Sequence, residues 1–255
     1  MDMAASKKIL QERSYKVVYR EGDTVVKRYL KGHPKEYVFN EAHIQSVVEA
    51  TGLPVPKVIS VTPDGEDWLL TMEYVKGRTM KELFEENKKK PKAFAKLMDK
   101  FIDIQLDVNS RKAEGLRNTR TKMDEAIAGL SDIDASTRYE LRQRIHGMER
   151  HTKLCHGDLT PGNVILNDDG SYFILDWAHA SKGNAGADAA ITYMMTSLYY
   201  PDFAKKYLKA YCARADMPIQ YIQKWMPIVA AHQLSKHIPG EEELLTKWIS
   251  VAEYQ

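Results

Sequence analysis

The residues best suited to chemistry lie in one stretch, positions 154 to 177, which reads LCHGDLTPGNVILNDDGSYFILDW. Asp158 and Asn163 fall in a predicted loop, and Asp176 ends the second strand of a predicted hairpin, residues 164–167 and 172–175. Because a hairpin folds the chain back on itself, Asp176 is expected to return close to Asn163. A carboxylate together with an amide oxygen is a ligand set that Mg²⁺ prefers, usually along with the phosphates of a substrate.

Asp158 supplies a further carboxylate, which can accept a proton from a hydroxyl nucleophile. A loop aspartate, an asparagine on the metal and a second aspartate on the metal form the template for phosphoryl transfer. The motif HGD, followed five positions later by Asn163 and then by Asp176, matches the protein-kinase catalytic set with two substitutions. Gly stands where protein kinases carry Arg, and Trp-Ala stands where they carry Phe-Gly. The pattern therefore predicts transfer of a phosphoryl group to a hydroxyl group.

The strings HGDLTPGNVIL and ILDWAHA resemble the aminoglycoside phosphotransferase and choline-kinase-like family of small-molecule kinases. The resemblance extends in order over most of the chain. It implies ATP and Mg²⁺ as cofactors, Asp158 as the catalytic residue that accepts the hydroxyl proton, and Asn163 and Asp176 as the metal ligands. It also implies a small-molecule hydroxyl acceptor.

The nucleotide-binding residues follow from the same resemblance. Lys27 in VVKRY is similar to the strand lysine that holds the α- and β-phosphates, and Glu41 in FNEAHI is similar to its ion-pair partner. The segment Met72-Glu73-Tyr74-Val75 resembles the linker whose backbone receives the adenine ring, which assigns Glu73 and Val75 to nucleotide binding.

Two residues are predicted to support the site without reacting. His156 is expected to bond to backbone and orient the loop rather than act as a base, and Asp188 in GADAA resembles the aspartate that braces the catalytic loop. Thr160 departs from the family, which often has His or Lys there. No GxGxxG precedes Lys27, and the candidate phosphate-covering turn, residues 19–24, has one glycine.

The elements that must position these residues change along the chain. The first third predicts strands at 16–20, 24–30, 58–61 and 68–74 around one helix at 36–50, which Gly52 and the following prolines end. From residue 80 to about 150, and again after 187, helical spacing dominates, as in Phe94, Met98 and Phe101; residues 110–125 are predicted as a polar surface excursion.

These elements, read with the resemblance, predict an α+β fold of the bilobal protein-kinase-like type. An N-terminal lobe, residues 1–75, has a small antiparallel sheet with one helix and binds the nucleotide. A larger, mainly helical lobe, residues 76–255, carries the catalytic loop and the acceptor site. The nucleotide is expected in the cleft between lobes. Acceptor specificity is expected from residues 100–130 and from the helices after 187.

Composition excludes several classes of protein. The chain has 255 residues, 44% of them hydrophobic, which is enough for a large core and excludes wholesale disorder. A net charge of +2 is too balanced for nucleic-acid binding by bulk electrostatics. No apolar run is long enough to span a membrane, the N-terminus has no secretory apolar region, and two cysteines fit a reduced, cytoplasmic protein.

Other functions remain open at this point. The acceptor could be an aminoglycoside, choline, ethanolamine, a sugar or a lipid-linked amino alcohol, and the role could be antibiotic resistance or metabolism. A nucleotide-binding pseudokinase scaffold is disfavoured because none of the residues expected for phosphate binding, metal binding or catalysis is missing. A protein kinase is disfavoured because residues 178–187 leave no room for a long activation loop. Glu241-Glu242-Glu243 fits either the first turn of a helix or an acidic wall for a cationic substrate. ATP versus GTP and oligomeric state stay undecided.

Overall fold

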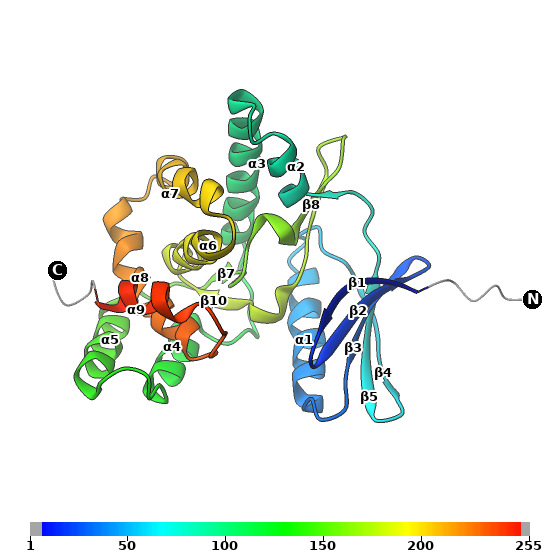
Figure 1. Ribbon diagram of the computed structural model, residues 1–255, viewed down its shortest axis with the longest axis horizontal. Coiled ribbons are helices and arrows are strands. Elements are labelled where there is room, and N and C mark those ends of the chain that lie inside the picture. The colour runs from blue at the N-terminus through cyan, green and yellow to red at the C-terminus, as the bar shows by residue number, and fades with distance from the viewer. Residues whose placement is uncertain (1–6, 251–255) are drawn as a thin grey trace, which may run out of the picture. The chain divides into compact units, whose positions relative to one another are not determined.

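The computed structural model describes residues 7–250 (Figure 1). Backbone contacts divide the chain into two compact units. Unit 1 comprises Met1–Glu82 and Gly162–Ala178, and unit 2 comprises Leu83–Pro161 and His179–Gln255. The segment that holds Asn163 and Asp176 therefore groups with the N-terminal part of the chain, whereas the predicted lobes were continuous in sequence. Their roles as a nucleotide lobe and an acceptor lobe stay a prediction.

Unit 1 is built on a five-stranded antiparallel sheet with the strand order β1-β2-β3-β5-β4. Its strands are β1 (Lys8–Arg13), β2 (Lys16–Glu21), β3 (Thr24–Tyr29), β4 (Val58–Asp64) and β5 (Asp67–Glu73). The four predicted strands are confirmed. The sequence did not predict β1, because its six residues are all exposed and give no alternating apolar pattern.

One helix, α1 (Lys35–Glu49), packs against this sheet (Figure 1). Val38 on the helix is fully buried with Leu70 and Met72 of β5, and this contact forms the core of the unit. The helix ends at the predicted position, where Gly52 adopts a φ of +78° that a side chain would disfavour.

A short hairpin completes unit 1. It consists of β8 (Val164–Leu166) and β9 (Tyr172–Ile174), and β6 (Arg78–Thr79) pairs along its other edge. The N–H of Ile174 donates to the carbonyl of Pro54 over 2.9 Å, which ties the hairpin to the rest of the unit. The predicted hairpin is confirmed, with each strand one residue shorter than expected.

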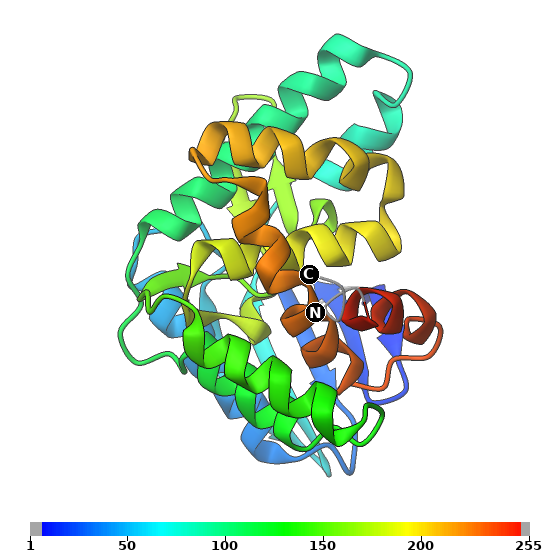
Figure 2. The ribbon, with the colours of Figure 1, turned by 90° about the vertical axis from the view of Figure 1, so that its left-hand side faces the viewer.

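Unit 2 is mainly helical, as predicted (Figure 2). After α2 (Met80–Glu86), which starts before the unit boundary, its helices are α3 (Pro91–Ser110), α4 (Thr119–Ala128), α5 (Ala135–Gly147), α6 (Ala185–Tyr199), α7 (Pro201–Ala215), α8 (Ile219–Leu234) and α9 (Glu242–Ser250). Two three-residue strands, β7 (Lys153–Cys155) and β10 (Ser181–Gly183), pair with each other. No helix within residues 7–250 is long and apolar enough to cross a membrane.

The prediction of a surface excursion over 110–125 is wrong at its C-terminal end, where α4 forms. The side chain of Asn118 caps the helix by accepting the N–H of Arg120. Only Thr119, Met123 and Ile127 are buried along the helix, so its apolar face is too narrow to stand out in a polar sequence.

Candidate active site

The ammonium group of Lys27 lies between two carboxylates in unit 1. Its Nζ atom is 2.5 Å from Oε1 of Glu41 and 2.7 Å from Oδ1 of Asp176. Lys27 comes from the central strand β3, Glu41 from α1, and Asp176 follows β9 of the hairpin. The structure thus brings together three of the residues predicted from the sequence.

The surroundings of Lys27 keep it charged. Burial alone lowers the pKa of this amine, but the carboxylates of Asp176 and Glu41 outweigh it and raise the pKa above the ordinary lysine value. The hydroxyl of Tyr29 donates to the second oxygen of Glu41, and burial followed by that carboxylate raises the pKa of Tyr29. The Glu41 carboxylate is therefore held from two sides by residues two positions apart on one face of β3.

Asn163 and Asp176 lie on adjacent arms of the hairpin. Val164 pairs with Ile174 in the strand register, and one step further the N–H of Leu175 donates to the carbonyl of Asn163 over 2.8 Å. Asp176 follows directly and adopts a φ of 59°, a left-handed conformation that an aspartate tolerates at some cost. The expected return of Asp176 to Asn163 is thus observed as a backbone arrangement.

This donor set can be tested against the magnesium that the sequence implies. The Asp176 side chain is 41% exposed, and Asn163 is half-buried, so the hairpin end is open to solvent. Within residues 7–250 no group of three or more His, Cys, Asp or Glu side chains could hold a metal. One carboxylate and one amide oxygen suit an ion that keeps waters and binds nucleotide phosphates, which is the usual behaviour of Mg²⁺ in proteins. The residues therefore fit a magnesium–nucleotide complex.

The predicted adenine-binding linker follows β5. Glu73 is exposed and Val75 is buried, and no residue within 7–250 accepts a hydrogen bond from the Val75 N–H. Between them, the N–H of Tyr74 donates to the carbonyl of Asp23 over 2.9 Å, and the guanidinium of Arg20 lies 3.8 Å from the Tyr74 ring centre. The linker is thereby attached to the turn between β2 and β3, the candidate phosphate-covering turn.

The catalytic-loop residues lie in unit 2, where β7 leads into them. Gly157 has a φ of +78°, and a Cβ added to it would lie 2.6 Å from the carbonyl oxygen of His179. No larger residue fits here, which explains why this chain departs from the Arg of protein kinases. The N–H of Gly157 donates to Oδ1 of Asp188 over 2.8 Å.

Two buried side chains support this loop. Oδ2 of Asp188 accepts from Nδ2 of Asn109, which also donates to the carbonyl of Leu154, so α3 and α6 are both attached to the strand before the loop. His156 is fully buried, and its Nδ1 accepts the N–H of Asp158 over 3.2 Å. Asp188 and His156 thus each hold a backbone N–H of the loop, and their supporting roles stay a prediction.

Asp158 is half-buried beside two further polar groups. Burial, and after it the Asp158 carboxylate, raises the pKa of Tyr200, while a hydrogen bond with the Thr160 side chain opposes this shift. Lys236 also lies within electrostatic reach of Asp158. Thr160, which replaces a basic residue in the family pattern, therefore contacts a tyrosine.

Several residues of these clusters were not predicted from the sequence. Tyr29 could have been found, because it lies two positions after Lys27 and so on the same strand face. Asn109, Tyr200 and Lys236 carry no motif, and only the packing of helices brings them to the loop.

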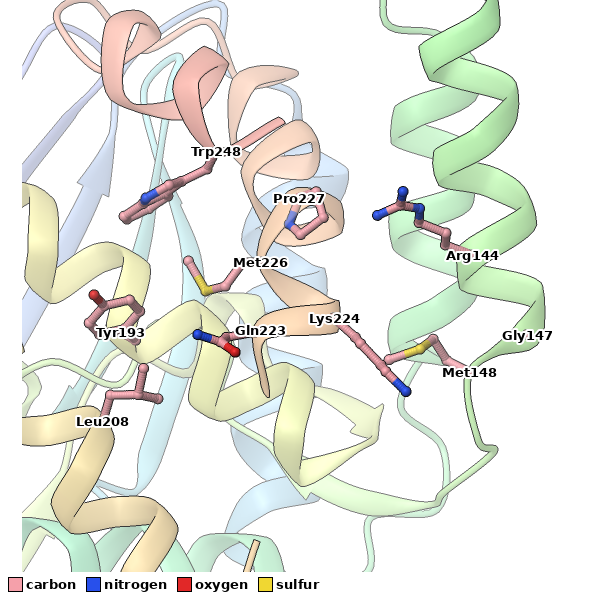
Figure 3. A pocket seen from close by; sticks show the side chains of 10 residues that line it. All are labelled: Arg144, Gly147, Met148, Tyr193, Leu208, Gln223, Lys224, Met226, Pro227 and Trp248. Atoms are coloured by element: carbon pink, nitrogen blue, oxygen red, sulfur yellow. The ribbon is translucent and has the colours of Figure 1, made fainter. Parts of the chain in front are cut away.

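A separate groove of about 570 Å³ lies among the helices of unit 2 (Figure 3). Tyr193 of α6 and Trp248 of α9 stack at one end, with ring centres 6.1 Å apart, and Arg144 of α5 and Lys224 of α8 lie towards the other. It contains none of the predicted site residues. Glu242 and Glu243 lie in the first turn of α9, as predicted, whereas Glu241 precedes the helix, is buried, and accepts hydrogen bonds from Gln233 and Tyr199.

The chain is similar to known proteins in its family and its fold. A sequence model of the phosphotransferase enzyme family matches residues 10–221. No curated protein matches the chain by sequence at a significant level.

Solved structures share the fold. A thermostable mutant of aminoglycoside phosphotransferase APH(4)-Ia, in a ternary complex with ADP and hygromycin B, is 12% identical, with a TM-score of 0.70 over 96% of this chain and 91% of that chain. Aminoglycoside-3'-phosphotransferase of type VIII is 15% identical, with a TM-score of 0.64 over 91% and 94%. Choline kinase LicA from Streptococcus pneumoniae is 14% identical, with a TM-score of 0.63 over 97% and 94%. The predicted kinase-like fold class is confirmed.

Proposed function

The chain belongs to the phosphotransferase enzyme family, and from that premise we propose that it moves the γ-phosphoryl group of ATP to a hydroxyl group of a small molecule. The observation that supports this most directly is the ammonium group of Lys27 held between Glu41 and Asp176. A fixed, permanently charged lysine beside a candidate magnesium ligand suits the phosphates of a nucleotide.

In the proposed reaction Asp158 orients the acceptor hydroxyl and accepts its proton as the oxygen bonds to the γ-phosphorus. The bond between that phosphorus and the bridging oxygen breaks, and its electron pair leaves with ADP. Lys27, positioned by Glu41, binds the α- and β-phosphates, and Asn163 and Asp176 would hold Mg²⁺. When bound, Mg²⁺ supplies positive charge to the phosphates. Glu73 and Val75 offer backbone groups to adenine.

Positioning residues complete the proposal. Asp188 fixes the N–H of Gly157, and His156 fixes the N–H of Asp158, so the loop carboxylate is held before the acceptor binds. Such preorganisation is the main source of rate in phosphoryl transfer, because there is little covalent chemistry for the protein to do.

The test is transfer of the γ-phosphoryl group from Mg-ATP to a panel of hydroxyl acceptors, with Asp158→Asn as the inactive variant and Asp168→Asn as the control. Asp168 is an exposed aspartate in the hairpin turn, so Asp168→Asn makes the same chemical change at a position outside the proposed reaction. Asp158→Asn should lower kcat by roughly 10²–10⁴-fold without weakening nucleotide binding. Transfer that survives this change, or failure to bind Mg-ATP, would overturn the proposal.

The first acceptors to test come from the structural neighbours: hygromycin B, which is bound in one of them, and choline, after which another is named. Both are cations. Nucleotide binding without transfer to any hydroxyl would instead favour a scaffold.

A further inference from the structure

Two lysines and a histidine lie near the catalytic loop of unit 2, outside the residues that the mechanism uses. They are Lys122 on α4, His232 at the C-terminal end of α8, and Lys236, two residues after that helix ends. α4 and α8 are in contact with each other. An aminoglycoside or choline carries positive charge, so neither is the acceptor expected beside two lysines.

Lys122 is fixed to the loop by geometry. Its Nζ donates to the carbonyl of His179 over 2.9 Å, and that carbonyl abuts Gly157, the residue before Asp158. The start of α4 is anchored as well, since the hydroxyl of Thr119 lies 2.8 Å from that of Ser181 in β10. The ammonium of Lys122 is thus held next to the catalytic loop with hydrogen-bonding capacity to spare.

Lys236 lies four residues after His232, in the turn that follows α8, and is exposed to solvent. Within residues 7–250 its ammonium makes no hydrogen bond or ion pair, although the carboxylates of Asp158 and Glu241 are within electrostatic reach. The Nδ1 atom of His232 is buried and has no hydrogen-bond partner in the described part of the chain.

The positive charge of Lys122 and Lys236 is only partly compensated by the carboxylates of Asp158 and Glu241. Burial lowers the pKa of Lys122 to about 8, with Lys236 and Arg117 adding to the shift, and the thiol of Cys155 opposes it weakly. Burial, then Lys236 and Lys122, lowers the pKa of His232 to about 3, so the imidazole is neutral. Glu241 offers little compensation, because it is buried and engaged by Gln233 and Tyr199. A negative group placed among these side chains would be stabilised.

We propose that Lys122 and Lys236, beside the neutral imidazole of His232, form a subsite for an anionic group of the acceptor. The acceptor is then a hydroxylated anion, such as a hydroxy acid or a sugar acid, rather than an aminoglycoside or choline. This inference rests on the proposed function for its reaction. The anion itself would be bound by ammonium groups through charge-assisted hydrogen bonds.

These lysines could instead bind the γ-phosphate of ATP. The experiment distinguishes that phosphate from an anionic group of the acceptor. Inorganic sulfate is titrated calorimetrically into protein loaded with Mg²⁺ and AMP-PNP, whose γ-phosphate position is filled. We expect saturable sulfate binding that Lys236→Met and Lys122→Met each weaken by about tenfold or more. Lys236→Arg should restore it. Lys224→Met is the matched control, because Lys224 is an exposed lysine of α8 that lines the separate groove (Figure 3).

Three results would overturn the inference. Sulfate that binds only in the absence of AMP-PNP would assign the lysines to the γ-phosphate. Sulfate that binds equally to wild type and to both Met variants would show an adventitious ion only. Failure to bind sulfate in either state would remove the subsite. Failure to bind AMP-PNP would instead contradict the proposed function, and sulfate binding to the protein alone would still decide the subsite.

A matched acceptor series gives the second readout. Galacturonic acid, galactose and galactosamine share a skeleton and differ in charge, as do a hydroxy acid, its amide and the corresponding amino alcohol. The acid of a series should have the highest kcat/KM, and Lys236→Met should raise the KM for that acid, whereas Lys224→Met should not. Preference for the amine, or an unchanged KM for the acid in Lys236→Met, would contradict the subsite.

Discussion

The Nζ atom of Lys27 lies 2.7 Å from Oδ1 of Asp176, a residue 149 positions further along the chain. This ion pair attaches the hairpin that carries the candidate magnesium ligands to the central strand of the sheet. Because Glu41 holds the other side of the same ammonium group, these two ion pairs fix the proposed phosphate-binding lysine and the proposed magnesium ligand together.

Replacing Lys27 tests this arrangement. Lys27→Met leaves the carboxylate of Glu41 beside Tyr29 without its cation, and breaking a buried pair in this way costs about 3 kcal/mol of unfolding free energy. We also expect the dissociation constant for Mg-ATP to rise at least tenfold. Urea unfolding and nucleotide titration measure the two effects. Arg28→Met is the control. Arg28 lies on the same strand as Lys27 and forms a more exposed ion pair with Asp67, so its loss should leave nucleotide affinity unchanged.

Asp188 is predicted to act on the rate through the catalytic loop. In Asp188→Asn the amide offers one acceptor oxygen, so the N–H of Gly157 and Nδ2 of Asn109 can no longer both donate to it. We expect a loss of about 1–3 kcal/mol in stability, since one buried donor is left unpaired. In steady-state kinetics kcat should fall while the KM for ATP is retained. A change confined to the KM for ATP would contradict the bracing role.

Gly157 is predicted to tolerate no side chain. In Gly157→Ala the new methyl group meets the carbonyl of His179, and the left-handed backbone adds about 1 kcal/mol of strain. Gly170→Ala provides the control, because Gly170 has a φ of +83° but nothing within 4 Å of the added Cβ. Thermal unfolding and kcat should separate them: both variants lose stability, and only Gly157→Ala loses most of its activity.

His232 should make the protein sensitive to acid. Its pKa is lowered to about 3 by burial and then by Lys236 and Lys122, whereas an unfolded histidine titrates near its ordinary value of 6.5. Between these values the unfolded chain binds a proton that the folded chain does not, so stability falls as pH falls from about 6.5 towards 3. Unfolding free energies at about pH 7 and about pH 5 measure the slope. His232→Gln should flatten it; His43→Gln, at an exposed position, should not.

The anionic subsite should weaken in alkali. The pKa of Lys122 is lowered to about 8 by burial and then by Lys236 and Arg117, so its ammonium loses its proton above that pH. Sulfate affinity of the protein loaded with Mg²⁺ and AMP-PNP should therefore fall several-fold between about pH 7 and about pH 9. Because bound sulfate favours the charged amine, binding near pH 8 should take up protons, visible as a buffer-dependent heat. An affinity that stays constant over this range would exclude Lys122 from the subsite.

The sequence by itself determined the family, the catalytic loop, the hairpin and most of the N-terminal sheet. These features are written in local patterns: alternating apolar residues, turn residues between them, and a motif whose members lie within a few positions of one another. The match of the phosphotransferase enzyme family to residues 10–221 confirms the resemblance found in those motifs. The sequence did not predict the strand β1 or the helix α4, because neither buries enough apolar surface to give a periodic pattern of apolar residues.

Only the tertiary structure decided which distant groups share an environment. The pairing of Lys27 with Asp176, the bond from Gly157 to Asp188 and the approach of Lys122 to the loop all join residues far apart in sequence. The direction of a pKa shift at Lys122 or His232 depends on such neighbours and on burial, and neither follows from the residue types along the chain. The phosphotransferase family could therefore be recognised from the motifs, whereas the charges around Lys122 and His232 depend on how the helices of unit 2 pack.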